Sequence, residues 1–338
     1  MLRYFAFSAV ITIAAVVTAL LAQGVGAMVT IIVLIAIEIA FSFDNAVINA
    51  KVLARLSRLW QQLFLTVGMV FAILGMRFVF PILIVMVTTG LPWGTVIDTA
   101  LNDPHKYAHY LEAAHISIAA FGGSFLLLLT LYFLFDGGER EILWLQRLER
   151  PLQRAGGSVW IPPLLAALIV VILSLFAGDD AAEVLRAGLA GVAVYAAIKL
   201  IIDGLGKLAP AAQKTYTGWP AFLAFLYLQL LDASFSFDGV LGAFAITDKV
   251  LLIALGLGVG AFWVRSLTVF MVRHGTLDVY RYLEHGAHYA ILVLAAALLG
   301  SIFYPVPDAV TGVVGLGIIA SSFIASRQAL RASHNKAI

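Results

Sequence analysis

The sequence predicts an all-α polytopic membrane protein of about ten transmembrane helices, arranged as two inverted repeats of five helices. Three observations support this prediction. The chain has 338 residues, of which 62% are hydrophobic and only 12% are charged, about half the charge of a soluble domain. Its mean hydropathy is +1.01, and its apolar residues form continuous runs, which favours helices over an alternating β-barrel. One acidic motif also occurs twice.

The predicted transmembrane spans are ten continuous apolar runs. Backbone groups in hydrocarbon must be hydrogen-bonded within their own segment, so each run is expected to be a helix. Pro81 is expected to kink the third run. The cytoplasmic loop 136–160 is charged, and Trp144, Leu145 and Leu148 within it indicate a short interfacial helix. The spans are 3–22, 28–50, 61–87, 115–135, 161–177, 184–202, 219–247, 250–272, 287–303 and 308–326.

Lysine and arginine are sorted to one side of the membrane if the N-terminus is cytoplasmic. Of the 21 such residues, 15 then lie in inner loops or at the inner ends of spans, as the positive-inside rule expects. We therefore expect a multi-pass protein of the plasma (inner) membrane with both termini in the cytoplasm. The 15 residues are Arg3, Lys51, Arg55, Arg58, Arg140, Arg147, Arg150, Arg154, Lys207, Lys214, Arg273, Arg281, Arg327, Arg331 and Lys336.

The duplicated motif places four carboxylates inside apolar spans. Glu38-Ile-Ala-Phe-Ser-Phe-Asp44 returns 194 residues later as Asp232-Ala-Ser-Phe-Ser-Phe-Asp238. A carboxylate at the centre of a transmembrane helix costs roughly 2.5 to 3.5 kcal/mol, so a pattern that carries this cost twice indicates a function. The simplest interpretation is a cation site built from two matching halves.

The duplication also predicts the topology. The two motif copies fall in the second and seventh spans, and a shift of five spans reverses the direction of the second copy. This is the inverted-repeat architecture of many secondary transporters, whose sites lie near the bilayer midplane. The predicted repeats are 1–178 and 179–338. Two further landmarks recur in the same order. Gly68 and Arg77 of the first repeat correspond to Gly256 and Arg265 of the second. Tyr110-Leu111-Glu112 with His115 corresponds to Tyr282-Leu283-Glu284 with His288.

The donors of the predicted site are all hard oxygens, which suit Mg²⁺, Ca²⁺ or Mn²⁺. Six residues rotate a helix by about 240°, so both acids of one motif reach one ion only where the helix unwinds. Gly239 permits such unwinding in the second copy. Ser42 and Ser236 add hydroxyl groups. The predicted ligands are Glu38, Asp44, Asn45, Asp232 and Asp238.

Two arginines lie near the middle of predicted spans. Arg77 and Arg265 are either counter-charges, which pair with an acid when the cation leaves, or members of fixed structural ion pairs. A cluster of carboxylates without its cation takes up protons readily, so exchange of protons for metal is expected to be easy.

Several functions are excluded by what the sequence lacks. There is no cysteine, and hence no thiolate metal site or thiol nucleophile. There is no G-x-x-x-x-G-K-[ST] motif for a nucleotide and no H-E-x-x-H motif for a zinc enzyme. The net charge of +2 gives no reason to expect nucleic acid. We therefore expect no resident cofactor and no enzymatic activity.

The two motifs resemble those of the TerC family of integral membrane proteins. The first resembles the family at residues 38–47, and the second at 232–238 and 244–247, with a further likeness at 265–267. The resemblance covers about half of the chain and implies Mn²⁺ export or metal homeostasis, with a historical link to tellurite resistance. It implies the same five functional positions. The chain departs from the family pattern at Gly239 and Leu241, where the family has Ser and Pro.

The expected function is therefore secondary transport of a divalent cation, most simply export of Mn²⁺ in exchange for protons. Three alternatives from other classes remain open. One is an exporter of amino acids or other small organic solutes, for which only Arg77 and Arg265 offer a partner to a substrate carboxylate. Another is an intramembrane aspartyl protease that uses Asp44 and Asp238, although no G-x-G-D motif follows. The third is a protein that transports nothing and serves as a partner of other membrane proteins.

Overall fold

A computed structural model describes most of the chain, and the described part is all-α. It contains no β-strand, and only an isolated bridge pairs Leu56 with Tyr216. The elements fall into two compact units, Met1–His115 with Pro210–Phe270 and Ile116–Ala209 with Met271–Ile338. The described residues are 2–71, 75, 79–136, 142–156, 158–208, 215–244, 246–247 and 249–336.

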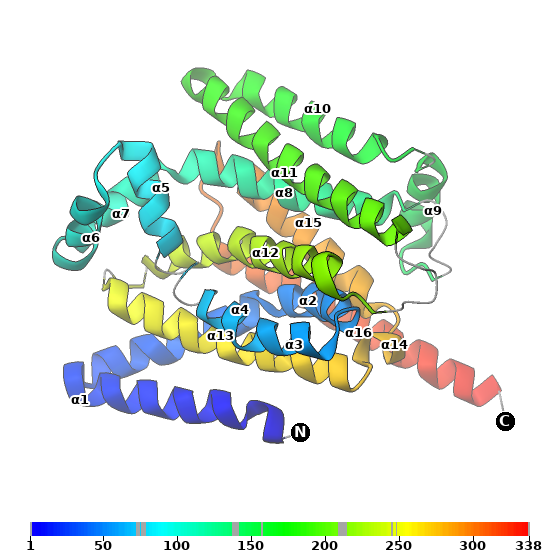
Figure 1. Ribbon diagram of the computed structural model, residues 1–338, viewed down its shortest axis with the longest axis horizontal. Coiled ribbons are helices and arrows are strands. Elements are labelled where there is room, and N and C mark those ends of the chain that lie inside the picture. Colours follow the sequence, from blue (N-terminus) through cyan, green and yellow to red (C-terminus); the bar gives the residue numbers. More distant parts are fainter. Residues whose placement is uncertain are drawn as a thin grey trace. The chain divides into compact units, whose positions relative to one another are not determined.

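The first unit begins with helix α1 (Leu2–Phe41), which Gly24 divides into two arms (Figure 1). Gly24 has φ 83° and ψ −171°, a conformation that only glycine adopts without strain. The arms correspond to the first predicted span and the start of the second. Both pack on α13 (Val250–Arg273), through a cluster of Ala19, Ala27, Ile31, Ile35, Leu252 and Val259.

The third predicted span, 61–87, is not one continuous helix. Its described parts form α3 (Arg58–Leu65), α4 (Val67–Val70) and α5 (Phe80–Thr89). Thr66 separates the first two with φ −105° and ψ −77°. Pro81 lies in the first turn of α5. Residues 72–74 and 76–78 before it lie outside the described residues, so the kink expected at Pro81 stays a prediction. Two short helices follow, α6 (Trp93–Asn102) and α7 (Pro104–Ala113).

The remaining helices of this unit place the two motif copies in contact range. Helix α2 (Phe43–Ala54) continues from α1 after Ser42, and α12 (Gly218–Phe244) packs against α1, α2, α3 and α7. The first motif therefore lies at the junction of α1 and α2, and the second lies in α12.

The second unit is a helical bundle of its own. It contains α8 (His115–Leu134), α9 (Gln146–Ala155), α10 (Ile161–Phe176), α11 (Ala181–Leu208), α14 (Thr276–Val279), α15 (Leu283–Ser301) and α16 (Asp308–Lys336). Helices α10 and α11 pack together as a hairpin across a short turn, Gly178–Asp180, and α15 packs along α16. Small residues permit the close packing: a Cβ at Gly188 would lie 2.6 Å from Val170, and one at Gly123 would lie 2.8 Å from Leu299.

The lengths of the helices support a multi-pass membrane protein. Within the described residues, six helical segments are long and apolar enough to cross a bilayer. They are Tyr4–Ala40, His115–Leu134, Gly178–Ile201, Val250–Arg273, Leu283–Ser301 and Val310–Arg331. Helix α10 is apolar but shorter. Large apolar side chains such as Phe7, Val10 and Leu21 are exposed along α1, as expected for a surface in contact with lipid.

Candidate functional site

The first motif is built around a one-residue interruption between two helices. Glu38 lies in the last turn of α1, and Asp44 and Asn45 lie in the first turn of α2. Ser42 between them has φ −98° and ψ 15°, and its Oγ donates a hydrogen bond to Glu38 Oε1 at 3.1 Å. The amides of Ser42 and Ala46 still bond one turn back, so the unwinding is limited to this point.

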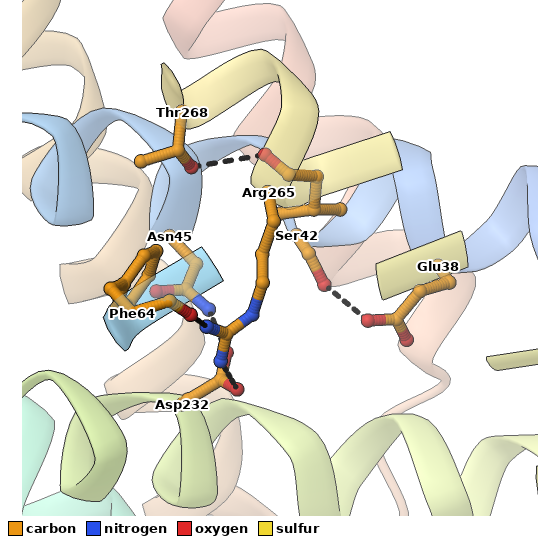
Figure 2. A network of polar contacts seen from close by, with 8 residues as sticks. Glu38, Ser42, Asn45, Phe64, Asp232, Arg265 and Thr268 are labelled. Carbon is orange, nitrogen blue, oxygen red and sulfur yellow. Dashed lines mark hydrogen bonds and ion pairs between the residues drawn. The ribbon is translucent and has the colours of Figure 1, made fainter. Parts of the chain in front are cut away.

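The second motif meets the first through Asp232. Asn45 Nδ2 donates a hydrogen bond to Asp232 Oδ1 at 2.9 Å (Figure 2). The other oxygen, Asp232 Oδ2, lies 3.2 Å from Nη2 of Arg265. Residues 187 positions apart in the chain are therefore in direct contact. The predicted contact between the two motif copies is present for this pair.

Arg265 is held in place from several sides. Its side chain is buried, and its Nη1 donates a hydrogen bond to the Phe64 carbonyl oxygen at 2.6 Å. Its guanidinium lies 4.2 Å from the centre of the Phe64 ring, a cation–π contact. Gly68 makes room for it, because a Cβ there would lie 2.8 Å from Arg265 Nη1. Gly68 and Arg265 are landmarks of opposite repeats, so a second feature of the duplication also converges here.

The other two described acids of the motifs have separate surroundings. Glu38 and Asp44 are each 6% exposed. Asp44 Oδ1 accepts a hydrogen bond from the backbone N–H of Asn45 at 2.8 Å, and Glu38 contacts Ser42. In Figure 2 the contact of Glu38 with Ser42 is not joined by a dashed line to the contacts among Asn45, Asp232 and Arg265. Over the described residues, no three His, Cys, Asp or Glu side chains come together as a metal-ligating group.

Two site residues were missed by the sequence reasoning, Asn49 and Gln229. Both are buried, and Asn49 Oδ1 and both amide atoms of Gln229 have no hydrogen-bond partner; Asn45 Oδ1 also has none. Buried polar atoms are nearly always paired, so these unpaired atoms in a native protein require an explanation. The signal was available in the spacing: Asn49 lies one turn after Asn45, and Gln229 lies one turn before Asp232.

A glycine pair on α13 places Glu38 and was also missed. A Cβ at Gly260 would lie 2.5 Å from Glu38 Cβ, and one at Gly256 would lie 2.6 Å from Leu34 Cβ. The helices α1 and α13 therefore approach closely along a Gly-x-x-x-Gly stripe, a common device of membrane helix pairs. This motif was visible in the sequence and explains why Glu38 is enclosed.

Some predicted positions lie outside what the structure describes. Arg77 belongs to the residues that are not described, and the side chains of Ser236 and Asp238 are likewise outside the description. The backbone of α12 remains helical through Gly239 to Phe244. The unwinding expected near Gly239 is therefore not seen, whereas the first motif is interrupted at Ser42. The protease alternative depends on Asp238 and is not tested by the described residues.

The chain belongs to the family described as protein of unknown function (DUF475), whose model matches residues 43–333. The matched region contains Asp44, Asn45, Asp232 and Arg265, and it begins after Glu38. No match was found among curated proteins. None was found among solved structures either.

Proposed function

We propose that this protein is a secondary transporter that exports a divalent cation, with Mn²⁺ favoured, across the plasma membrane. The observation that carries the proposal is the buried contact between the two motif copies, in which Asn45 and Asp232 meet beside Arg265. A buried carboxylate, amide and arginine from separate helices are costly to maintain, and such intramembrane groups typically mark ion pathways.

The donor chemistry supports a hard divalent cation. Unpaired amide oxygens of Asn45, Asn49 and Gln229 lie in the same unit as Asp232, and amide and carboxylate oxygens are the ligands that Mg²⁺, Ca²⁺ and Mn²⁺ prefer. Glu38, Asp44 and Asp238 are the further acids that we assign to the pathway. The resemblance to TerC proteins favours Mn²⁺ among these ions.

We assign Arg265 the role of an internal counter-charge. A cation and a guanidinium compete for the same carboxylate, so a metal ion that binds Asp232 must displace the ion pair with Arg265. Return of Arg265 to Asp232 would then help to release the ion. The alternative interpretation, a permanent structural ion pair, predicts that Arg265 affects stability but not the coupling of transport.

The composition of the two units supports an inverted repeat. In the ten-span scheme, the second and third spans of each repeat lie in the first unit, and the fourth and fifth spans of each repeat lie in the second unit. These four pairs of corresponding spans each lie within one unit, whereas the first spans, 3–22 and 184–202, lie in different units. This pairing is expected where two repeats build one transport pathway and exchange elements.

The test is counterflow of Mn²⁺ in proteoliposomes that contain the full chain. Vesicles loaded with unlabelled Mn²⁺ and containing the wild-type protein are expected to accumulate labelled Mn²⁺. Competition by Mg²⁺, Ca²⁺ or Zn²⁺ measures the selectivity for the ion. The effect of a pH gradient on the flux shows whether protons are exchanged. Asp232→Asn should reduce flux roughly tenfold or more, because the site loses its charge. The matched control is Asp179→Asn, which alters an exposed acid of the turn before α11. Normal flux in Asp232→Asn would refute the proposal.

Export of amino acids or other small organic solutes is the second candidate, because Arg265 is buried beside Asp232 and could pair with a substrate carboxylate. The same vesicles distinguish the two. If amino acids or small carboxylic acids, and not divalent cations, support counterflow, the organic solute is the substrate. If only the cations do so, this candidate is excluded.

A further inference from the structure

The second unit holds a buried carboxylate that the transport proposal does not use. Glu149 of α9 is 1% exposed. Its Oε1 accepts hydrogen bonds from the Leu145 amide at 3.1 Å and from Tyr289 Oη at 2.9 Å. Its Oε2 accepts one from the Trp144 amide at 3.2 Å and lies 3.4 Å from His285 Nε2. Glu149 therefore closes the first turn of α9 and attaches this helix to α15.

This attachment determines which face of α9 points outward. The side of Glu149 is turned inward, with Leu152 and Gln153 partly buried beside it. Arg147, Arg150 and Arg154 are all exposed, and at 100° per residue they lie within about 60° of one another on the opposite side. Glu149 is the only acidic residue of α9, so the exposed face is purely basic.

The basic face is followed in the chain by an apolar helix with exposed side chains. Helix α10 starts seven residues after Arg154, and its side chains Leu164 and Leu175 are 66% and 77% exposed. Trp160, a residue type that favours the membrane interface, immediately precedes it and is 62% exposed. The exposed apolar side chains that flank or join the basic face are Ile142, Leu145, Leu148, Val159 and Trp160.

We propose that the face of α9 formed by Arg147, Arg150 and Arg154 binds anionic phospholipid head groups at the membrane surface where α10 enters the bilayer. Arginine presents a planar fork of donors that matches phosphate oxygens. Leu148 beside the arginines inserts among the acyl chains, as in other interfacial helices. The combination of basic and exposed apolar residues next to a lipid-facing helix favours a membrane over a soluble acidic protein. The inference does not depend on which solute is transported.

The first test measures lipid preference of the purified full chain. Binding of phosphatidylglycerol and of phosphatidylcholine is followed by native mass spectrometry for the wild type and for the variant Arg147→Gln, Arg150→Gln, Arg154→Gln. Each arginine near an anionic surface contributes about fivefold, so the triple variant should lose its preference for phosphatidylglycerol by roughly tenfold or more. The control carries Arg273→Gln, Arg327→Gln and Arg331→Gln, which remove the same charge from other exposed positions expected on the same side.

The outcomes of this comparison separate the explanations. Loss of preference in the α9 variant alone supports the proposal. An equal loss in both variants, or a loss in neither, overturns it. Displacement of the bound phosphatidylglycerol by soluble glycerol phosphate would also overturn it, because the face would then bind a free anion rather than a membrane.

A second test locates the helix without removing an arginine. The chain has no cysteine, so Leu148→Cys carries a single spin label. In nanodiscs that contain phosphatidylglycerol, the label is expected to be more accessible to oxygen and less accessible to a polar nickel reagent than in phosphatidylcholine alone. Asp180→Cys, in the exposed turn before α11, is the matched control. A label at Leu148 that stays in water in both lipids would overturn the proposal.

Discussion

Arg265 is a full positive charge held out of solvent on α13, and its neighbours show how single residues shape this protein. Asp232 supplies the opposite charge, Phe64 supplies a carbonyl and a ring face, and Gly68 supplies the space. Such a pair does not by itself stabilise a fold, because desolvation of two charges offsets their attraction. A role in function explains better why this ion pair is buried in the interior.

The first prediction concerns this ion pair. Arg265→Met leaves Asp232 buried without its partner and is expected to lower the free energy of unfolding by about 3 to 5 kcal/mol. Arg265→Met with Asp232→Asn removes both charges and should be less destabilising than Arg265→Met alone. Chemical unfolding in detergent, followed by tryptophan fluorescence, measures both. A double variant at least as unstable as Arg265→Met would contradict the prediction.

At the scale of elements, the close contact between α1 and α13 depends on Gly256 and Gly260. The second prediction is that Gly260→Ala forces Glu38 and α1 away from α13 and costs about 1 to 3 kcal/mol of unfolding free energy. Gly26→Ala is the control in the same unit, because a Cβ at Gly26 would meet no other atom within 4 Å. That control should be neutral or slightly stabilising. Equal thermal midpoints for the two variants would refute the packing argument.

The attachment of α9 to α15 predicts a dependence on pH. Burial raises the pKa of Glu149, but hydrogen bonds from His285, the Leu145 amide and Tyr289, with the charge of His285, outweigh it and lower the pKa from 4.5 to about 2. The folded state therefore favours the ionised carboxylate. This stabilisation is fully present above pH 4.5 and is lost as the pH falls from 4.5 toward 2.

The third prediction follows because the ionised form of Glu149 stabilises the folded state. Glu149→Gln should lower the unfolding midpoint at about pH 7, and the difference from the wild type should shrink at about pH 3.5, where the wild-type carboxylate begins to lose its advantage. Differential scanning fluorimetry at both pH values measures it. Trp144, whose ring lies 5.9 Å from the Tyr289 ring, gives a local signal. A difference of the same size at both pH values would show that the charge of Glu149 is irrelevant.

The helices that the sequence predicted best are those whose residues form long apolar runs. Long apolar runs predicted α8, α10, α13 and α15 closely, because hydrocarbon leaves the backbone no alternative to a helix. The span 61–87 was predicted less well, because the helix is interrupted at Thr66 and α5 begins at Phe80. The short helices α6 and α7 lie between the third and fourth predicted spans, where no helix was predicted.

In the candidate site, too, the sequence predicted some features and missed others. The contact of Asn45 with Asp232 was expected because the motif is duplicated, and duplication is visible in sequence. Gln229 and the Gly-x-x-x-Gly stripe could have been found from their spacing, but the packing of Gly260 against Glu38 could not, because Glu38 lies in a distant part of the chain. Single-sequence patterns carry no direct record of such long-range neighbours.

At the scale of the whole molecule, the proposed transport requires the acids of both motif copies. The fourth prediction is that Asp44→Asn and Asp238→Asn each abolish Mn²⁺ flux in proteoliposomes while the protein remains folded, because a neutral amide cannot offset the charge of the ion. Size-exclusion profiles and thermal midpoints serve as the folding control. Unchanged flux in either variant would remove that residue from the pathway.

The interruption at Ser42 has a mechanical consequence. Helices α1 and α2 are regular on either side of it, so a change in the backbone torsions of this one residue would swing Asp44 and Asn45 as a rigid arm relative to Glu38. Such a swing would break the hydrogen bonds that the amides of Ser42 and Ala46 make one turn back. The free-energy cost of changing the geometry around the carboxylates would therefore be set by these two bonds and not by the unfolding of a whole helix.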